Sequence, residues 1–207
     1  MKADDVTRAV SLAVSALTPA EKQDWTRPAD SLTWTCWETA EHMADALFGY
    51  AGQLTPPNPS TTTWVRFGYQ QRRPEGPYLT MYVEHDEGVP ALLEVLESCG
   101  GLLAAVIATV PPDRMSFHSY NASDSSGFAA MGVVEVLVHT HDIARAFDLP
   151  WTPPAEMCAA ALTRLFPWAP TDTDPWPTLL WATGRTDLPG QAHQTSWKWD
   201  GSPRDLA

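Results

Sequence analysis

The chain has 207 residues and a formal net charge of −12 at pH 7, with 44% hydrophobic and 18% charged residues. Its length suits one sizeable core, so we expect residues 1–207 to form a single domain. The negative charge argues against binding to nucleic acid or to anionic lipid, because a basic face supplies most of the affinity for either. The composition is that of a globular protein, and apolar runs such as GLLAAVIATV are too short to cross a bilayer.

The spacing of apolar residues predicts a first helix over residues 3–17. A second helix is expected over 34–54, where TPPNPSTTT ends it because consecutive prolines remove backbone donors and fix φ. The stretch PYLTMYVEH alternates weakly between apolar and polar residues, so we expect it either to form a short extended segment or to begin a loop.

A third helix is expected over 89–110, where a Pro-Pro pair stops it. The segment SYNASDSSG offers several N-caps for a fourth helix over 125–148. Shorter helices are expected over 153–165 and 176–183, and an irregular tail or a short strand over 188–207. Long helices joined by proline-rich connections predict an all-α fold, an antiparallel four-helix bundle with short additional C-terminal helices.

The three cysteines, Cys36, Cys99 and Cys158, are widely spaced and set in apolar surroundings. This pattern disfavours both a disulfide framework and a cysteine zinc cluster, and it predicts buried free thiols. The N-terminal stretch MKADDVTRAVSLAVSAL places acids among its apolar residues, which is not the pattern of a secretory signal. We therefore expect a soluble cytoplasmic protein.

The predicted fourth helix contains MGVVEVLVHTHDIARAF, which is nearly apolar yet carries a polar stripe. At about 100° per residue, Glu135, His139 and Asp142 fall within roughly a 60° arc on one face. The remaining surface is apolar, so the helix should be buried, where unpaired ionised groups are costly. A divalent cation would compensate, because Glu-x-x-x-His can direct a carboxylate oxygen and an imidazole nitrogen at one ion. Taken alone, the pattern favours a histidine hydrogen-bonded within a polar core network.

A further ligand has to come from another segment of the chain. His42 lies in the middle of the second predicted helix, on a stripe with polar residues such as Glu38 and Asp45. Ala46 and Gly49 would leave open space beside its ring, as a ligand pocket needs. Periodicity alone does not decide whether His42 faces the core or the solvent.

Two motifs together, WETAEHMADAL on the second helix and EVLVHTHDIARAF on the fourth, resemble the DinB/YfiT-like metalloenzyme superfamily. The nearest branch is the N-terminal domain of mycothiol-dependent maleylpyruvate isomerases, and the approach DWTRPADSLTWTCWETAEH also resembles that family. The similarity covers about residues 5 to 185. It implies a four-helix bundle in which His42, Glu135 and His139 hold a divalent metal, most often Zn²⁺, with Ni²⁺, Fe²⁺ and Mn²⁺ as alternatives.

The segment HTHDIARAF resembles a signature of that branch, His-x-Trp-Asp-hydrophobic-Ala-Arg, with His141 replacing tryptophan and with Asp142 and Arg145 in their expected places. We expect Asp142 to pair with Arg145, its i, i+3 neighbour, in preference to holding an imidazole. His141 points about 100° away from the midline between Glu135 and His139 and is expected to form a core or surface hydrogen bond.

Isomerases of this branch carry a separate C-terminal domain that contributes a substrate-binding arginine, and fewer than thirty residues follow the last predicted helix here. The resemblance therefore implies a mycothiol S-transferase or a mycothiol-dependent isomerase acting on a small electrophile, with maleylpyruvate itself disfavoured. Five arginines are candidates for binding an anion, but each is more simply a solvated surface charge: Arg66, Arg72, Arg73, Arg164 and Arg185.

Trp37, Tyr50 and Arg145 are the candidate residues for binding the thiol cosubstrate. Trp34 and Trp37 lie near the start of the helix that carries His42, and Tyr50 lies two turns beyond it, although packing is the commoner role of such rings. No catalytic residue is assigned.

Two other classes of function are compatible with the same residues. One is a non-catalytic small-molecule-binding or stress protein that keeps the bundle and the metal, because a fold can persist after its chemistry changes. The other is a thiol-independent biosynthetic or hydrolytic enzyme, in which water takes the place of the thiol. We expect small molecules as partners, no nucleic acid and no membrane, and a monomer or homodimer.

Overall fold

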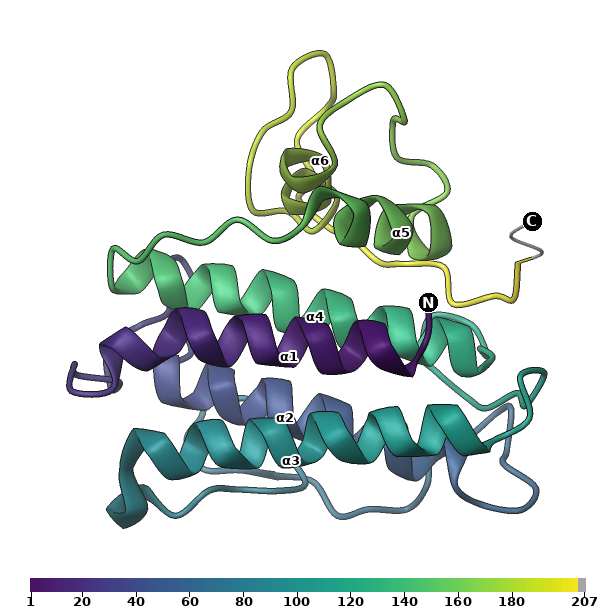
Figure 1. The fold of residues 1–207 in the computed structure, drawn as a ribbon, viewed down its shortest axis with the longest axis horizontal. Helices are drawn as coiled ribbons and strands as arrows, with labels where there is room; N and C mark the ends of the chain where they lie inside the picture. Colours follow the sequence, from purple (N-terminus) through teal and green to yellow (C-terminus); the bar gives the residue numbers. More distant parts are fainter. Residues whose placement is uncertain (205–207) are drawn as a thin grey trace.

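The computed structural model describes residues 1–204, which are mostly helical (Figure 1). The helices are α1 (Ala3–Leu17), α2 (Cys36–Leu54), α3 (Gly88–Thr109), α4 (Ser125–Ala146), α5 (Ala155–Leu165) and α6 (Pro175–Ala182), with 3-10 turns η1 (Thr18–Ala20) and η2 (His85–Glu87). The short strands β1 (Gln70–Gln71) and β2 (Tyr78–Leu79) pair antiparallel, with Gln70 opposite Leu79. The predicted helical content is confirmed, and each predicted helix begins and ends within two residues of the observed one.

Helix α4 lies in the middle of the molecule. The four long helices α1 to α4 lie side by side, and α5 and α6 form a further layer beyond α4 (Figure 1). Helices α1 and α2 each pack against both α3 and α4, while α5 packs against α4 and α6 against α5. Helix α4 therefore has neighbours on both sides. Its surface is apolar nearly all round, which is typical of a buried helix.

Capping residues set where α2 and α4 begin. The hydroxyl of Thr35 accepts a hydrogen bond from the backbone N–H of Glu38 at 3.1 Å, and the Glu38 carboxylate accepts one from the backbone N–H of Thr35 at 2.8 Å. Asp124 caps α4 by accepting from the N–H of Gly127 at 2.7 Å. A cap residue lies outside the helix it starts, so α2 begins at Cys36 and not at Trp34 as expected.

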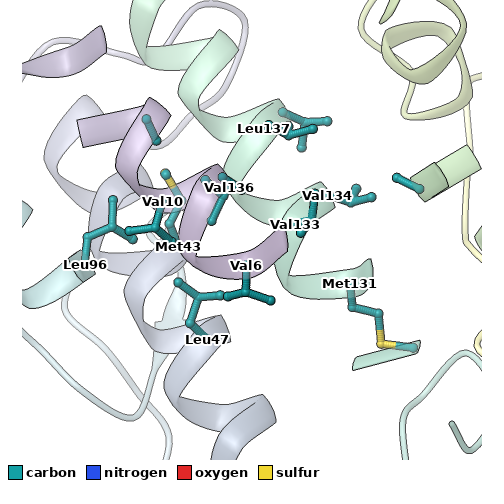
Figure 2. Close-up of a cluster of buried hydrophobic side chains, with 14 of the residues drawn as sticks. Val6, Val10, Met43, Leu47, Leu96, Met131, Val133, Val134, Val136 and Leu137 are labelled. Carbon is teal, nitrogen blue, oxygen red and sulfur yellow. The ribbon is translucent and has the colours of Figure 1, made fainter. Parts of the chain in front are cut away.

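The core lies between the four long helices, and Figure 2 shows its side chains meeting from all of them. Gly132 on α4 permits a close approach, because a Cβ atom there would lie 2.8 Å from Leu103 on α3 and 3.0 Å from Leu47 on α2. The cysteines are free and buried, as predicted.

The helical stretch His85–Thr109 is long and apolar enough to cross a membrane by length and composition alone. The separate apolar runs in the sequence did not predict this. In this fold Leu92, Leu96 and Leu103 are fully buried against the other long helices. A buried core helix and a membrane span have the same composition, so this feature does not distinguish them.

Residues 189–204 of the C-terminal segment are irregular, in line with the prediction, but they are tied to the helices. Its Asp200 N–H donates to the carbonyl of Leu165 at 2.8 Å, and its Gly201 N–H donates to the carbonyl of Tyr120 at 2.9 Å. The guanidinium of Arg164, with its side chain 1% exposed, donates to the carbonyl of Ser202 at 3.0 Å.

Arg164 also forms an ion pair with Asp124, the N-cap of α4, at 2.8 Å. The expectation that Arg164 is a solvated surface charge is therefore wrong. Periodicity on α5 could not show that the C-terminal segment returns to cover this side chain and to supply carbonyl acceptors for it.

Candidate metal centre and its pocket

The three predicted metal ligands come together between α2 and α4. The nearest ligand atoms of His42, Glu135 and His139 all lie within 4.8 Å of one another. The Glu135 Oε2 atom lies 3.4 Å from Nε2 of His42 and 3.3 Å from Nε2 of His139. The two imidazole rings are nearly perpendicular, with centroids 5.0 Å apart. His42 thus faces the core, which its position on α2 left undecided, and the group could hold a metal ion.

Each ligand on α4 is held by a neighbour. The hydroxyl of Tyr50 donates to Oε1 of Glu135 at 3.1 Å, so Oε2 is the oxygen that faces the histidines. Nδ1 of His139 lies 2.9 Å from Oδ2 of Asp142. A proton on that Nδ1 leaves the lone pair on Nε2, the atom that faces Glu135. Two imidazole nitrogens and one carboxylate oxygen form a donor set that suits Zn²⁺ and similar divalent cations.

Asp142 does not pair with Arg145, and this prediction is wrong. Its carboxylate binds Arg185, from the segment after α6, through Nε at 2.9 Å and Nη2 at 2.7 Å. The Arg145 side chain is two-thirds exposed and lies 3.7 Å from Asp30. Helix spacing identified a possible neighbour of Asp142, but the two parallel hydrogen bonds of a guanidinium fork require the approach that only Arg185 has. Arg185 is therefore not a solvated surface charge either.

The electrostatics of the cluster favour positive charge. Burial alone would raise the pKa of Glu135, but hydrogen bonds and charges from His139 and His42 hold it well below its usual range. Burial alone would lower the pKa of His139, but its contacts with Asp142 and Glu135 raise it above the ordinary value. Burial and the charge of Glu135 raise the pKa of Tyr50, which stays a neutral donor. Glu135 therefore stays ionised near neutral pH, and a proton and a metal cation compete for Nε2 of His139.

A pocket of about 530 Å³ opens beside the three candidate ligands. Its wall includes Tyr50 and Arg185, and Trp34 from the loop before α2 lies with its ring centroid 4.8 Å from that of His42. The connection between α3 and α4 and the C-terminal segment contribute further residues to the wall. Another hollow, of about 690 Å³, lies near Met1, and no histidine among residues 1–204 lines it.

The other predicted site residues are divided between the pocket and its surroundings. Tyr50 lines the pocket, whereas Trp37 is buried outside it and stacks on His85 with ring centroids 4.2 Å apart. Trp37 precedes His42 by five residues, which places its ring on another face of α2. Arg145 lies outside the pocket lining. His141 packs edge-on against Trp176, away from the pocket, as its angle on the helix predicts.

His118 is a pocket residue that the sequence did not single out. It lies between α3 and α4, is 6% exposed, and its Nδ1 accepts a hydrogen bond from the backbone N–H of Tyr120 at 3.0 Å. Its ring lies among those of Tyr50, Trp64 and Trp199, with centroids 5.3 to 6.0 Å away. Burial lowers the pKa of His118 to about 4, although the charge of Glu135 acts in the opposite direction. The available signal was a histidine set between aromatic residues in SFHSY.

Acidification is expected to destabilise the protein through His118. Its pKa is lower in the folded state than the ordinary value near 6.5, so the unfolded chain binds the proton more readily. The free energy of unfolding should fall by up to about 3 kcal/mol as the pH drops from about 6.5 to about 4. Urea unfolding measured at several pH values tests this, with His118→Gln as comparison. An equally steep loss in His118→Gln would contradict the assignment.

Comparison with known proteins adds no relative, because no protein-family model, curated protein or solved structure matches this chain. In this chain, two imidazoles from different helices and one carboxylate meet at the wall of a pocket.

Proposed function

We propose that the protein is a divalent-metal-dependent thiol enzyme on a DinB-like four-helix bundle. It would bind a small thiol, mycothiol, and present the sulfur to a small electrophile. The observation that carries this proposal is the meeting of His42, Glu135 and His139 beside a pocket of about 530 Å³. Three protein ligands leave a coordination position for an exchangeable ligand, the arrangement of catalytic zinc and not of structural zinc.

The chain itself supplies the ligands and holds them in place. A bound Zn²⁺ would stabilise the thiolate form of a sulfur ligand. Asp142 keeps Nε2 of His139 available and Arg185 orients Asp142, while Tyr50 orients Glu135. Outer partners of this kind typically account for a ten- to hundredfold change in metal affinity or activity, by the order of magnitude seen in zinc sites. They favour a built site over a chance cluster.

The reaction classes follow from the chemistry of a thiol. Displacement of a leaving group by the sulfur gives S-transfer, and addition followed by elimination gives isomerisation. A cytoplasmic location is part of the proposal, since a small thiol remains reduced there and the chain's own cysteines are free. We propose a monomer or homodimer that needs no nucleic acid and no membrane.

Cobalt substitution tests thiol binding directly. Protein loaded with Co²⁺ should gain a sulfur-to-metal absorption band on addition of mycothiol, or of N-acetylcysteine as a simpler probe. His141→Ala should keep the band, because its ring packs on Trp176 away from the pocket, and His139→Ala should lose it. No band at saturating thiol would exclude thiol ligation and point to a thiol-independent biosynthetic or hydrolytic enzyme.

A non-catalytic binding or stress protein is the alternative from another class. It would show the cobalt band without turnover. A panel of small electrophiles, assayed with and without thiol, separates the two. Thiol-dependent consumption of one of them supports the enzyme, and the band without any consumption across the panel supports the binding protein.

A further inference from the structure

The pocket wall holds two nitrogen donors that the metal centre does not use. Trp199 is 4% exposed, and its indole Nε1 is buried without a hydrogen-bond partner among the residues the structure describes. His118 uses Nδ1 to accept from Tyr120, so its neutral ring carries the proton on Nε2. Their ring centroids lie 5.4 Å apart. A buried donor left without an acceptor is costly, so an acceptor that reached this N–H from the pocket would relieve that cost.

Large flat rings surround these donors. Tyr120 and Trp197 line the same pocket, each with its ring centroid 5.9 Å from that of Trp199, and Trp34 lines it beside His42. Aromatic walls with a few placed polar atoms are typical of sites for small, flat and largely apolar ligands. The shape and the donors therefore agree on a planar molecule that carries an oxygen acceptor.

The charges of the side chains in the pocket wall indicate whether the ligand's acceptor oxygen has to be anionic. Arg185 lines the pocket, but its guanidinium is occupied by the carboxylate of Asp142 and by the carbonyl of Thr183. His118 is neutral near pH 7, as is an indole. A carbonyl oxygen can accept from two neutral N–H groups without a full negative charge, so an amide or ketone suits the wall and a carboxylate is not required.

The position of Trp199 is fixed by the backbone around it. The next two residues, Asp200 and Gly201, donate to the carbonyls of Leu165 and Tyr120 at 2.8 and 2.9 Å. The C-terminal segment therefore supplies a wall of the pocket that backbone hydrogen bonds hold in place.

We propose that His118 Nε2 and Trp199 Nε1 form a subsite for the oxygen of a planar, mostly apolar carbonyl compound, next to the metal centre. This deepens the proposed function, on which it rests for its catalytic meaning, because the subsite would hold the electrophile. The binding chemistry itself needs no metal and can be measured separately.

Benzamide is the probe, with benzoate as the charged acceptor and benzylamine as a ring of similar size without an oxygen. Isothermal titration should show benzamide binding to wild-type protein, with about fivefold weaker binding to Trp199→Phe, which keeps a ring and loses one donor. His118→Phe should weaken binding similarly. Trp168→Phe, a matched change at an exposed tryptophan outside the pocket lining, should bind as wild type does.

Nuclear magnetic resonance of ¹⁵N-labelled wild-type protein gives a second measurement that depends on no variant. The indole N–H signal of Trp199 should move downfield on addition of benzamide, while that of Trp168 stays in place. Each titration is repeated after treatment with a chelator. Retained Trp199-dependent binding in metal-free protein supports the subsite even if the metal function fails.

Three results would overturn the subsite. These are an unmoved Trp199 signal at saturating benzamide, equal affinity of Trp199→Phe and wild type, and benzylamine binding as tight as benzamide binding. Benzoate binding more tightly than benzamide would support the oxygen subsite and identify a carboxylate as its preferred acceptor. If Trp199→Phe fails to fold, His118→Phe and the wild-type spectrum decide the matter.

Discussion

Replacing His139 with alanine is expected to remove most of the bound metal. Wild-type protein should carry about one divalent ion per chain, as expected for a three-ligand site. The substitution removes one of the three candidate ligands, and it also leaves Asp142 without its imidazole partner. Because outer partners alone alter metal affinity about ten- to hundredfold, loss of a ligand should cost more than about a hundredfold. Elemental analysis and chelator competition measure this.

His141→Ala is the matched control, since it removes the same side chain from the same helix at a place that packs on Trp176. It should retain its metal, and Asp142→Asn should give an intermediate loss. Full metal retention in His139→Ala would refute the ligand assignment, and with it the metal-dependent function.

Replacing Arg164 with methionine is expected to destabilise the fold by about 3 kcal/mol, the order of magnitude for breaking a buried ion pair from one side. Methionine keeps much of the buried volume, but it leaves the carboxylate of Asp124 without its cation and the carbonyl of Ser202 without its donor. The C-terminal segment should then become a site of proteolytic cleavage. Urea unfolding and limited proteolysis measure the two effects.

Arg8→Met removes the same charge from an exposed ion pair, Arg8 with Glu156 at 2.9 Å. Exposed pairs contribute at most about 1 kcal/mol, so this variant should unfold nearly as wild type does. Similar losses in the two variants would show that burial of Arg164 is not what stabilises the C-terminal segment.

The helices were predictable because local rules determine most of their extent. Apolar periodicity and a proline-rich ending located α2, and the acid and hydroxyl groups before α4 included its cap, Asp124. The sequence did not predict the pairing of β1 with β2, because strands of two residues are too short to show an alternation of apolar and polar residues. The all-round apolar character of α4 did indicate burial, and the second layer of α5 and α6 explains it.

The site was predictable only in part. Spacing within one helix showed that Glu135 and His139 could face one ion, whereas their assignment as metal ligands, together with His42, came from the resemblance of two motifs. Arg185 and Trp199 come from segments whose place depends on tertiary packing, so no local pattern shows that they reach the pocket. The incorrect pairing of Asp142 with Arg145 has the same origin, because proximity along a helix does not exclude a better partner that is distant in sequence.

The enclosure of α4 on both sides has a consequence for how the length of this chain can vary. A single residue inserted between Glu135 and Asp142 would turn everything after it by about 100° and shift it by about 1.5 Å along the axis. The carboxylate that holds His139 would leave the pocket, and the side chains facing α5 would lose their contacts in the same event. Additions and losses should therefore be confined to connections such as the exposed loop after α2, while the number of residues in α4 stays constant.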